Sequence, residues 1–196
     1  MRRTGLTFIE LMTGIAILSV AMLAVYGVFS IGLKIWHRSH AERALQDVRL
    51  AFLKIDKEMK NTFFFSEIPF KGSEDKVTFP LSVNEGEKQK LYVVSYVIKN
   101  PSGSVLKELA REERYFSERA YENSDMVKVR TMVGSLKSAR FEYAYSNASG
   151  YEWLPYWDGT GQDQMPSGVR ISLEIESEND FYNKVIFLQH GKLGVR

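Results

Sequence analysis

The hydrophobic pattern of the chain is dominated by an uncharged stretch near its start. From Leu11 to Leu33 there are 23 consecutive residues without a formal charge. As an α-helix this stretch would be roughly 34 Å long, enough to cross a bilayer core of about 30 Å. A cleaved secretory signal has an apolar region of only about 7–15 residues, followed by a small-residue cleavage site. The stretch is longer than that and no such site precedes Lys34, so we expect a retained membrane-spanning helix.

The residues that follow keep a helical period but become amphipathic. Apolar residues recur every three or four positions, which predicts a helix with one apolar face. No proline occurs before Pro69, so we expect one helix from about Leu6 to about Lys60, with its second part covering a core. We interpret Asp56 and Glu58, among the charged residues of this part, as members of a mixed solvated face. The predicted apolar stripe consists of Ala41, Leu45, Val48, Phe52, Ile55 and Met59.

Beyond Asn61 the pattern changes from helical to extended. Short segments rich in β-branched and aromatic residues alternate with Gly, Asn, Ser and Pro, which is typical of strands and turns. From Val169 to Glu176 apolar and polar residues alternate, as in a strand with one buried face. We expect strands in the segments 62–70, 75–81, 90–100, 126–133, 139–146, 168–177 and 183–192.

Two parts of this region have a less regular pattern. The residues from Leu106 to Tyr121 fit either a pair of strands or a short helix, and Gly134 marks a turn that leads into a strand. The strands together predict an antiparallel sheet with one face on the helix and the other partly solvated. The predicted fold class is therefore α+β, with a long N-terminal α-helix packed on an antiparallel β-sheet domain.

The composition excludes some classes of function. The chain has 26 basic and 24 acidic residues, for a formal net charge of +2. A dedicated nucleic-acid-binding protein usually carries a strong basic excess on one face, so we expect no nucleic-acid partner. The chain contains no cysteine, which leaves neither a disulfide framework nor a zinc–thiolate site.

One acidic residue, Glu10, stands at the head of the apolar stretch. A carboxylate costs about 2–3 kcal/mol at the middle of a bilayer and less near its edge. Glu10 therefore either lies among the lipid headgroups and is solvated, or meets a positive partner such as a chain terminus. If the chain were cut between Gly5 and Leu6, the new α-amine would carry a positive charge at neutral pH. Glu10 would then lie within about 6 Å of that amine along the helix axis.

The segment GLTFIEL, from Gly5 to Leu11, resembles the prepilin signature G-F-T-L-I-E-L of type IV pilins and type II secretion pseudopilins. The resemblance implies that a membrane peptidase cuts after Gly5 on the cytoplasmic side and methylates the new terminus, Leu6. It also implies that Glu10, the fifth mature residue, aligns each subunit with the one before it. The sequence departs from the family at Leu6, where phenylalanine is commonest, and in having no proline within the span.

The pattern and the resemblance together divide the chain into four parts. These are a prepilin leader at 1–5, a transmembrane or filament-core helix at 6–34, an amphipathic helix at 35–61 and a β domain at 62–196. By the positive-inside tendency, Arg2 and Arg3 place the N-terminus in the cytoplasm, although basic residues just beyond the span weaken the asymmetry. The expected location is the bacterial inner membrane, single-pass, with the C-terminal domain in the periplasm.

The segment from Phe141 to Glu176 resembles the minor pseudopilin J of type II secretion. An aromatic strand precedes a loop with two tryptophans, Trp153 and Trp157, and a proline-led strand follows. The resemblance implies a non-enzymatic tip subunit of the periplasmic pseudopilus. Its expected partners are minor pseudopilins of the I and K types, the major pseudopilin, the prepilin peptidase and the inner-membrane assembly platform. Trp153 and Trp157 are either buried loop anchors or contacts to a partner subunit.

Three alternatives stay open at this point. The chain could be a minor pilin of a type IV or competence pilus, another pseudopilin, or a membrane-tethered periplasmic enzyme or sensor. An enzyme would need an ionisable cluster in a cleft, and the sequence indicates no catalytic residues, so we expect none.

The sequence gives little reason to expect a metal or cofactor. The loop from Asp158 to Asp163 is rich in oxygen ligands but lacks the spacing and closing glutamate of an EF-hand. Ordinary turn chemistry explains its residues, so calcium is the weaker alternative there. His37 and His40 are three residues apart near the end of the span, without a third ligand, and His190 lies in a polar tail. We expect no metal site and no cofactor.

Overall fold

The computed structural model describes residues 7–86, 88–116, 127–147, 150–159, 165–176 and 180–189; the side chains of 37–41, 85, 88, 146 and 147 lie outside this description. The chain divides into two compact units, Met1–Arg43 and Ala44–Arg196. A single helix, α1 (Phe8–Lys60), contributes residues to both. Its end at Lys60 confirms the end predicted from the apolar stripe.

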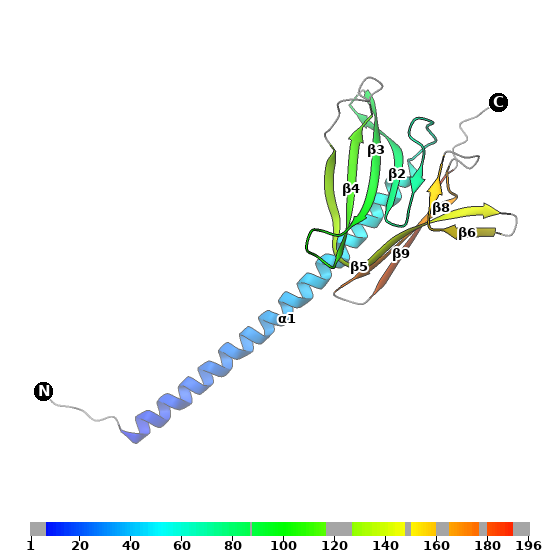
Figure 1. Cartoon of the computed structure of the whole chain (residues 1–196). Coiled ribbons are helices and arrows are strands. Elements are labelled where there is room, and N and C mark those ends of the chain that lie inside the picture. Colours follow the sequence, from blue (N-terminus) through cyan, green and yellow to red (C-terminus); the bar gives the residue numbers. More distant parts are fainter. Residues whose placement is uncertain are drawn as a thin grey trace. The chain divides into compact units, whose positions relative to one another are not determined.

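The second unit contains one antiparallel sheet (Figure 1). Its strand order is β7-β1-β2-β3-β4-β5-β8-β9, and β6 pairs with β5 outside this path. The α+β fold class, with a long N-terminal helix and an antiparallel sheet domain, is therefore confirmed. The strands are β1 (Lys71–Gly72), β2 (Lys76–Glu85), β3 (Lys88–Lys99), β4 (Lys107–Tyr115), β5 (Lys128–Asn147), β6 (Gly150–Leu154), β7 (Trp157–Asp158), β8 (Gly168–Ile175) and β9 (Phe181–Phe187).

The strand β5 corrects the prediction of a turn at Gly134. It runs as one element of 20 residues, and the chain passes Gly134 without reversing. The first half of β5 pairs with β4 and the second half with β8, and the register shifts where the partner changes, near Leu136. Ser135 in this bulge has a φ of 53°. A β-bulge bends a strand and increases its twist. The bend at this bulge lets the single strand β5 pair with β4 before it and with β8 after it.

The structure also tests the predictions for the segments Leu106–Tyr121 and 62–70. Of the segment Leu106–Tyr121, residues 107–115 form the strand β4, and residues 117–121 lie outside the described residues. The strand predicted at 62–70 is wrong, because this segment forms one isolated bridge, between Thr62 and Leu81, and then a turn closed by the Ile68 amide on the Phe65 carbonyl. The aromatic side chains of this segment indicated a strand. In the structure the segment is instead the loop that connects α1 to β1.

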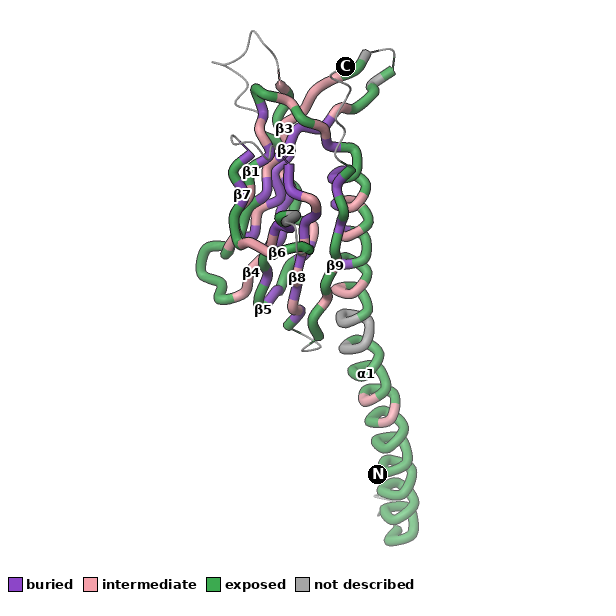
Figure 2. Tube along the Cα trace, turned by 90° about the vertical axis from the view of Figure 1, so that its right-hand side faces the viewer, coloured by how far each residue is buried: buried purple, intermediate pink, exposed green. Residues whose placement is uncertain are grey.

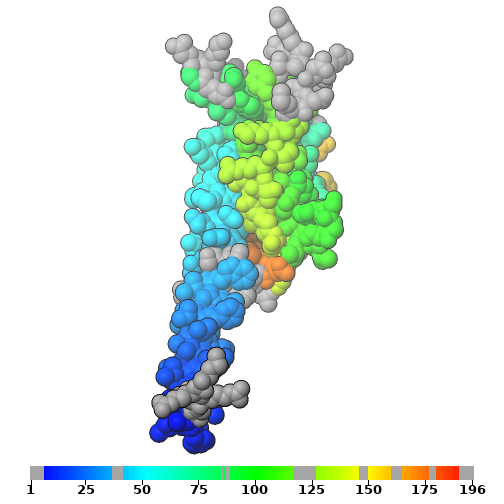
Figure 3. Space-filling view, turned by 90° about the vertical axis from the view of Figure 1, so that its left-hand side faces the viewer, coloured from blue at the N-terminus to red at the C-terminus, as the bar shows by residue number. Residues whose placement is uncertain are grey.

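The core of the second unit lies between the second part of α1 and one face of the sheet. Val48, Ile55 and Met59 of the predicted stripe are buried, and Leu45 and Phe52 are half-buried. Val48, Ile55 and Met59 belong to one cluster with inward residues of β2, β3, β5 and β8, and Phe52 packs against it. In β8 buried residues alternate with half-buried ones, so the predicted alternation is confirmed; Figure 2 draws the buried residues in purple. Figure 3 shows part of the outer surface of this unit, with β4 in green and β5 in yellow-green.

Candidate functional site

The N-terminal end of α1 is closed by Thr7 and Glu10. The Thr7 amide donates to Oε2 of Glu10 at 2.9 Å, and the Thr7 hydroxyl donates to the same oxygen at 2.8 Å. The Glu10 amide donates in return to Oγ1 of Thr7 at 3.4 Å. This reciprocal arrangement is a capping box, which satisfies amide groups that have no partner inside the helix.

The capping box gives Glu10 a local partner within its own chain. Gly5 and Leu6 lie outside the described residues, so the predicted cleavage and methylation site has no structural counterpart here. Glu10 lies in the first turn of α1 with an exposed side chain, four positions after Leu6 in the sequence. The sequence reasoning missed Thr7, although threonine followed three residues later by glutamate is the signature of this cap.

The segment Phe8–Trp36 of α1 is long and apolar enough to cross a membrane. Its hydroxyl side chains turn back to the helix backbone: Thr13 donates to the Ile9 carbonyl at 2.9 Å, and Ser19 to the Ile15 carbonyl at 2.8 Å. Because a bilayer core offers no water to polar groups, these bonds make both residues compatible with lipid.

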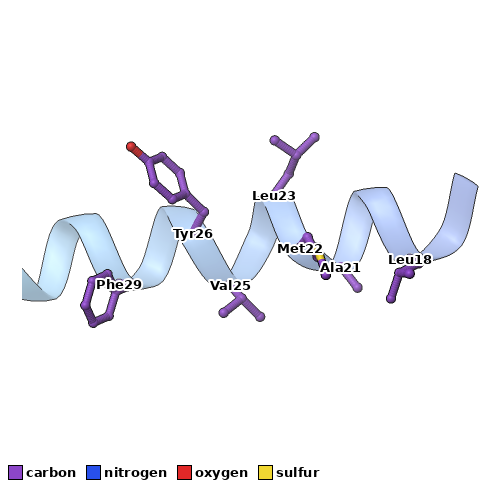
Figure 4. Close-up of a pocket in the computed structure, with 7 residues that line it drawn as sticks. All are labelled: Leu18, Ala21, Met22, Leu23, Val25, Tyr26 and Phe29. Carbon is purple, nitrogen blue, oxygen red and sulfur yellow. The ribbon is translucent and has the colours of Figure 1, made fainter. Parts of the chain in front are cut away.

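The side chains of this segment present a continuous apolar surface. Figure 4 shows one stretch of it, on which Tyr26 and Leu23 project to one side of the helix and Val25 and Phe29 to the other. The phenol oxygen of Tyr26 and the sulfur of Met22 are the side-chain heteroatoms among the seven residues shown. Such a surface suits lipid or the apolar face of another helix.

In the second unit, a buried ionic cluster joins α1 to the sheet. Glu58 is only 8% exposed, which corrects its interpretation as a solvated residue. Its Oε2 atom accepts hydrogen bonds from the Tyr96 hydroxyl at 2.7 Å and from Nε of Arg111 at 3.0 Å. Its Oε1 atom lies 3.0 Å from Nζ of Lys54, and Arg111 also bonds to Glu113. Every charge in the cluster therefore has an opposite charge beside it.

The cluster fixes the ionisation of its members. Burial by itself would raise the pKa of Glu58, but the hydrogen bonds from Arg111 and Tyr96 outweigh it and hold that pKa below the ordinary value. Burial would lower the pKa of Arg111, but its bonds to Glu58 and Glu113 raise it. Burial and the neighbouring Glu58 carboxylate raise the pKa of Tyr96. At neutral pH the cluster is a fully ionised clamp with a protonated tyrosine, which is a structural arrangement and not an acid–base pair poised for catalysis.

The two tryptophans predicted from the sequence lie in different surroundings. Trp157 on β7 is 8% exposed and belongs to the core cluster, with its ring centroid 6.3 Å from that of Tyr145. Trp153 on β6 is half-buried, and the guanidinium carbon of Arg170 lies 3.9 Å from its ring centroid, a cation–π contact. Nearby, Tyr151 and Phe187 are 59% and 58% exposed, with ring centroids 6.2 Å apart. The sequence reasoning singled out neither of these exposed rings.

The residues considered for metal binding are only partly described. Asp158 and Gly159 belong to the described chain, whereas residues 160–163 of the loop and His190 lie outside it. His37 and His40 lie within α1, and their side chains also lie outside the description. Among the described residues, no three histidine, aspartate or glutamate side chains lie together as metal ligands would.

Comparison with protein families gives one match. The prokaryotic N-terminal methylation motif matches residues 1–26, which include the predicted leader, Gly5, Leu6 and Glu10. A search among curated proteins found no match to the chain. The matched motif, the apolar helix and the antiparallel sheet indicate a membrane-anchored protein of the prepilin type. Such a motif implies processing by a prepilin peptidase and assembly with other pilins, and the class is structural.

Proposed function

We propose that this protein is a minor pseudopilin of type II secretion, of the J type, at the tip of a periplasmic pseudopilus. In this role it helps to start filament assembly and protein export across the outer membrane. The observation that carries the proposal is the methylation motif at residues 1–26 on a helix whose first turn holds an exposed carboxylate at Glu10. The resemblance of Phe141–Glu176 to the J family supports the finer assignment.

In the assembled filament, Glu10 pairs with the α-amine of a neighbouring subunit. Before assembly, the capping box with Thr7 gives the carboxylate two neutral hydrogen-bond donors but no opposite charge. Cleavage after Gly5 leaves Thr7 as the second mature residue, so the cap survives processing. Exchange of a neutral donor for a charged amine then strengthens the bond, because charge-assisted hydrogen bonds are roughly twice as strong as neutral ones.

Two substitutions separate this pairing from the capping role. Glu10→Ala removes both the charge and the cap, whereas Thr7→Val removes the capping hydroxyl and keeps the charge. We expect Glu10→Ala to abolish incorporation into filaments and Thr7→Val to reduce it only modestly, as measured in sheared filament fractions. Equal loss in both variants would show that Glu10 acts only as a helix cap.

The choice between secretion and pilus function is tested by partner capture. We expect the full chain, purified in detergent, to retain minor pseudopilins of the I and K types. A complex with type IV minor pilins, and none with I and K, would favour the alternative role in a type IV or competence pilus.

For the partner surface, we propose Trp153 with its exposed neighbours Tyr151 and Phe187. Trp153→Ala should weaken capture of the partners while the sheet stays folded. Trp157→Ala should instead lower stability, because Trp157 belongs to the core. Capture that is unchanged by Trp153→Ala would contradict this surface.

A further inference from the structure

A side chain from β8 reaches across β5 to a tryptophan on β6. Tyr143 and Ala144 of β5 each pair with a residue of β6 and with a residue of β8, so these two strands flank β5 on opposite edges (Figure 1). The register aligns Trp153 on β6 with Ala144, and Arg170 on β8 with Glu142. Glu142 and Ala144 are two positions apart and therefore project from the same face of β5. Trp153 and Arg170 thus share that face.

This face of the sheet is the outer one. Phe141 and Tyr143, on either side of the intervening position of β5, belong to the core cluster, so Ala144 points away from the core. Ala144 is nonetheless fully buried, which means that neighbouring side chains of the outer face lie over it. Gly168 of β8, aligned with Ala144, is buried as well. The row that begins with Trp153 therefore continues into two small residues, over which larger side chains have room to meet.

The side chains that meet there are those of Arg170 and Trp153. The guanidinium carbon of Arg170 lies 3.9 Å from the centroid of the Trp153 ring, so the cation covers one face of the indole. Nη1 of Arg170 donates to Oε2 of Glu142 at 3.3 Å. Because the guanidinium group is planar, its N–H groups bond within the plane while its face stays in contact with the ring. Glu142 therefore fixes the guanidinium group, and this group fixes one side of the indole.

A tryptophan held in this way is prepared for binding. An unrestrained surface side chain moves between several rotamers, and a partner that binds it must select one of them. Ordering one such side chain at an interface lowers the affinity by about two- to tenfold. A contact that orders Trp153 before the partner arrives removes this loss.

We infer that Arg170 is a positioning residue of the partner surface: it holds the Trp153 ring in the orientation that a partner subunit contacts, and Glu142 holds Arg170 in place. The inference rests on the proposed function, in which Trp153, Tyr151 and Phe187 form that surface. It adds the two residues that prepare the surface for binding. Their effect is on the affinity for the partner, through the position of the Trp153 ring.

Affinity measurements test this role. An immobilised complex of the I and K minor pseudopilins is exposed to the full chain in detergent micelles, and biolayer interferometry gives the dissociation constant. Arg170→Leu should weaken binding about three- to tenfold. Arg170→Lys keeps the charge but lacks the planar group, so it should recover only part of the affinity. Glu142→Gln should weaken binding in the same direction, because it removes the charge that fixes Arg170.

Arg140→Leu is the matched control for Arg170→Leu. The Nε atom of Arg140 lies 3.8 Å from the same Oε2 atom of Glu142, so this substitution removes an equal charge from the same surface. It should change the affinity by less than about twofold. Equal losses in Arg140→Leu and Arg170→Leu, or full recovery in Arg170→Lys, would show that charge alone acts and would overturn the inference.

A spectroscopic measurement follows the ring itself. The chain has three tryptophans, and labelling with fluorotryptophan gives each of them a fluorine resonance, assigned by replacing one tryptophan at a time with phenylalanine. In Arg170→Leu the Trp153 resonance should shift and narrow, because the ring gains freedom. The Trp157 resonance should stay in place, which shows that the core is intact. An unchanged Trp153 resonance would overturn the inference.

Binding by Trp153→Ala separates this inference from the proposed function. If Trp153→Ala weakens binding and Arg170→Leu does not, the positioning role is wrong and the partner surface stands. If Trp153→Ala binds like the parent protein, the partner surface is wrong and the positioning role falls with it. If the parent protein does not bind the I and K complex at all, the proposed function itself is contradicted, and the inference with it.

Discussion

The Nε atom of Arg111 on β4 lies 3.0 Å from Oε2 of Glu58 on α1, within the core between helix and sheet. The two residues are 53 positions apart in the chain. Because α1 also carries the prepilin-type segment, this ion pair attaches the sheet domain to the same helix that anchors the protein.

Removing one member of the clamp should destabilise the sheet domain. Glu58→Ala leaves Tyr96 and Arg111 buried without their shared acceptor, and breaking a buried pair in this way costs about 3 kcal/mol. Urea unfolding, followed by tryptophan fluorescence in detergent micelles, measures the loss. Lys57→Ala, at the exposed neighbouring position, is the matched control and should change the free energy of unfolding by less than about 0.5 kcal/mol. Similar small effects from both variants would show that the clamp contributes no stability.

Stability should also depend on pH through Glu58. The pKa of its carboxyl is held below 4.5 in the folded protein, so the unfolded chain takes up the proton more readily. The stabilisation is therefore fully present above about pH 4.5 and is lost as the pH falls through the folded pKa. Thermal unfolding between pH 7 and pH 3 should show this decline.

The variant Glu58→Gln isolates the contribution of this residue to the pH dependence. Asp56 and Glu113 also have lowered pKa values, so part of the acid dependence should remain in Glu58→Gln. We expect a smaller fall in melting temperature than in the parent protein. An identical pH profile for the two proteins would contradict the assigned ionisation of Glu58.

A glycine in β1 should be essential for packing. In Gly72→Ala the new methyl group would overlap the ring of Tyr143, and overpacking of this kind costs about 1–3 kcal/mol. Gly134→Ala is the matched control, because nothing lies within 4 Å of its Cβ position, and it should be neutral or slightly stabilising. The double variant Gly72→Ala, Tyr143→Leu should lose less free energy of unfolding than the two single variants lose together. Strict additivity would show that the ring and the methyl group do not compete for space.

The sequence predicted the main layout because its patterns are local. The apolar stripe from Val48 to Met59 and the alternation from Val169 to Glu176 each depend on residues close together in the chain, and both were confirmed. The cap of α1 could also have been predicted from the sequence, since its two residues, Thr7 and Glu10, are only three positions apart. The part of this cap that was not predicted is Thr7, the partner of Glu10.

The features that the sequence did not predict depend on distant partners. A glutamate on an amphipathic helix is ordinarily solvated, and nothing near Glu58 indicates that Arg111 and Tyr96 meet it in the core. The continuous strand β5 likewise depends on β4 and β8, which supply partners for its two halves.

The most direct test of the account is mass spectrometry of the N-terminus of the protein isolated from the membranes of its native host. The account predicts a chain that begins at Leu6 and carries a methyl group on its α-amine, whereas the Gly5→Ala variant keeps its leader. A native chain that still begins at Met1, or a Gly5→Ala chain of normal mature mass, would contradict the prepilin-type assignment.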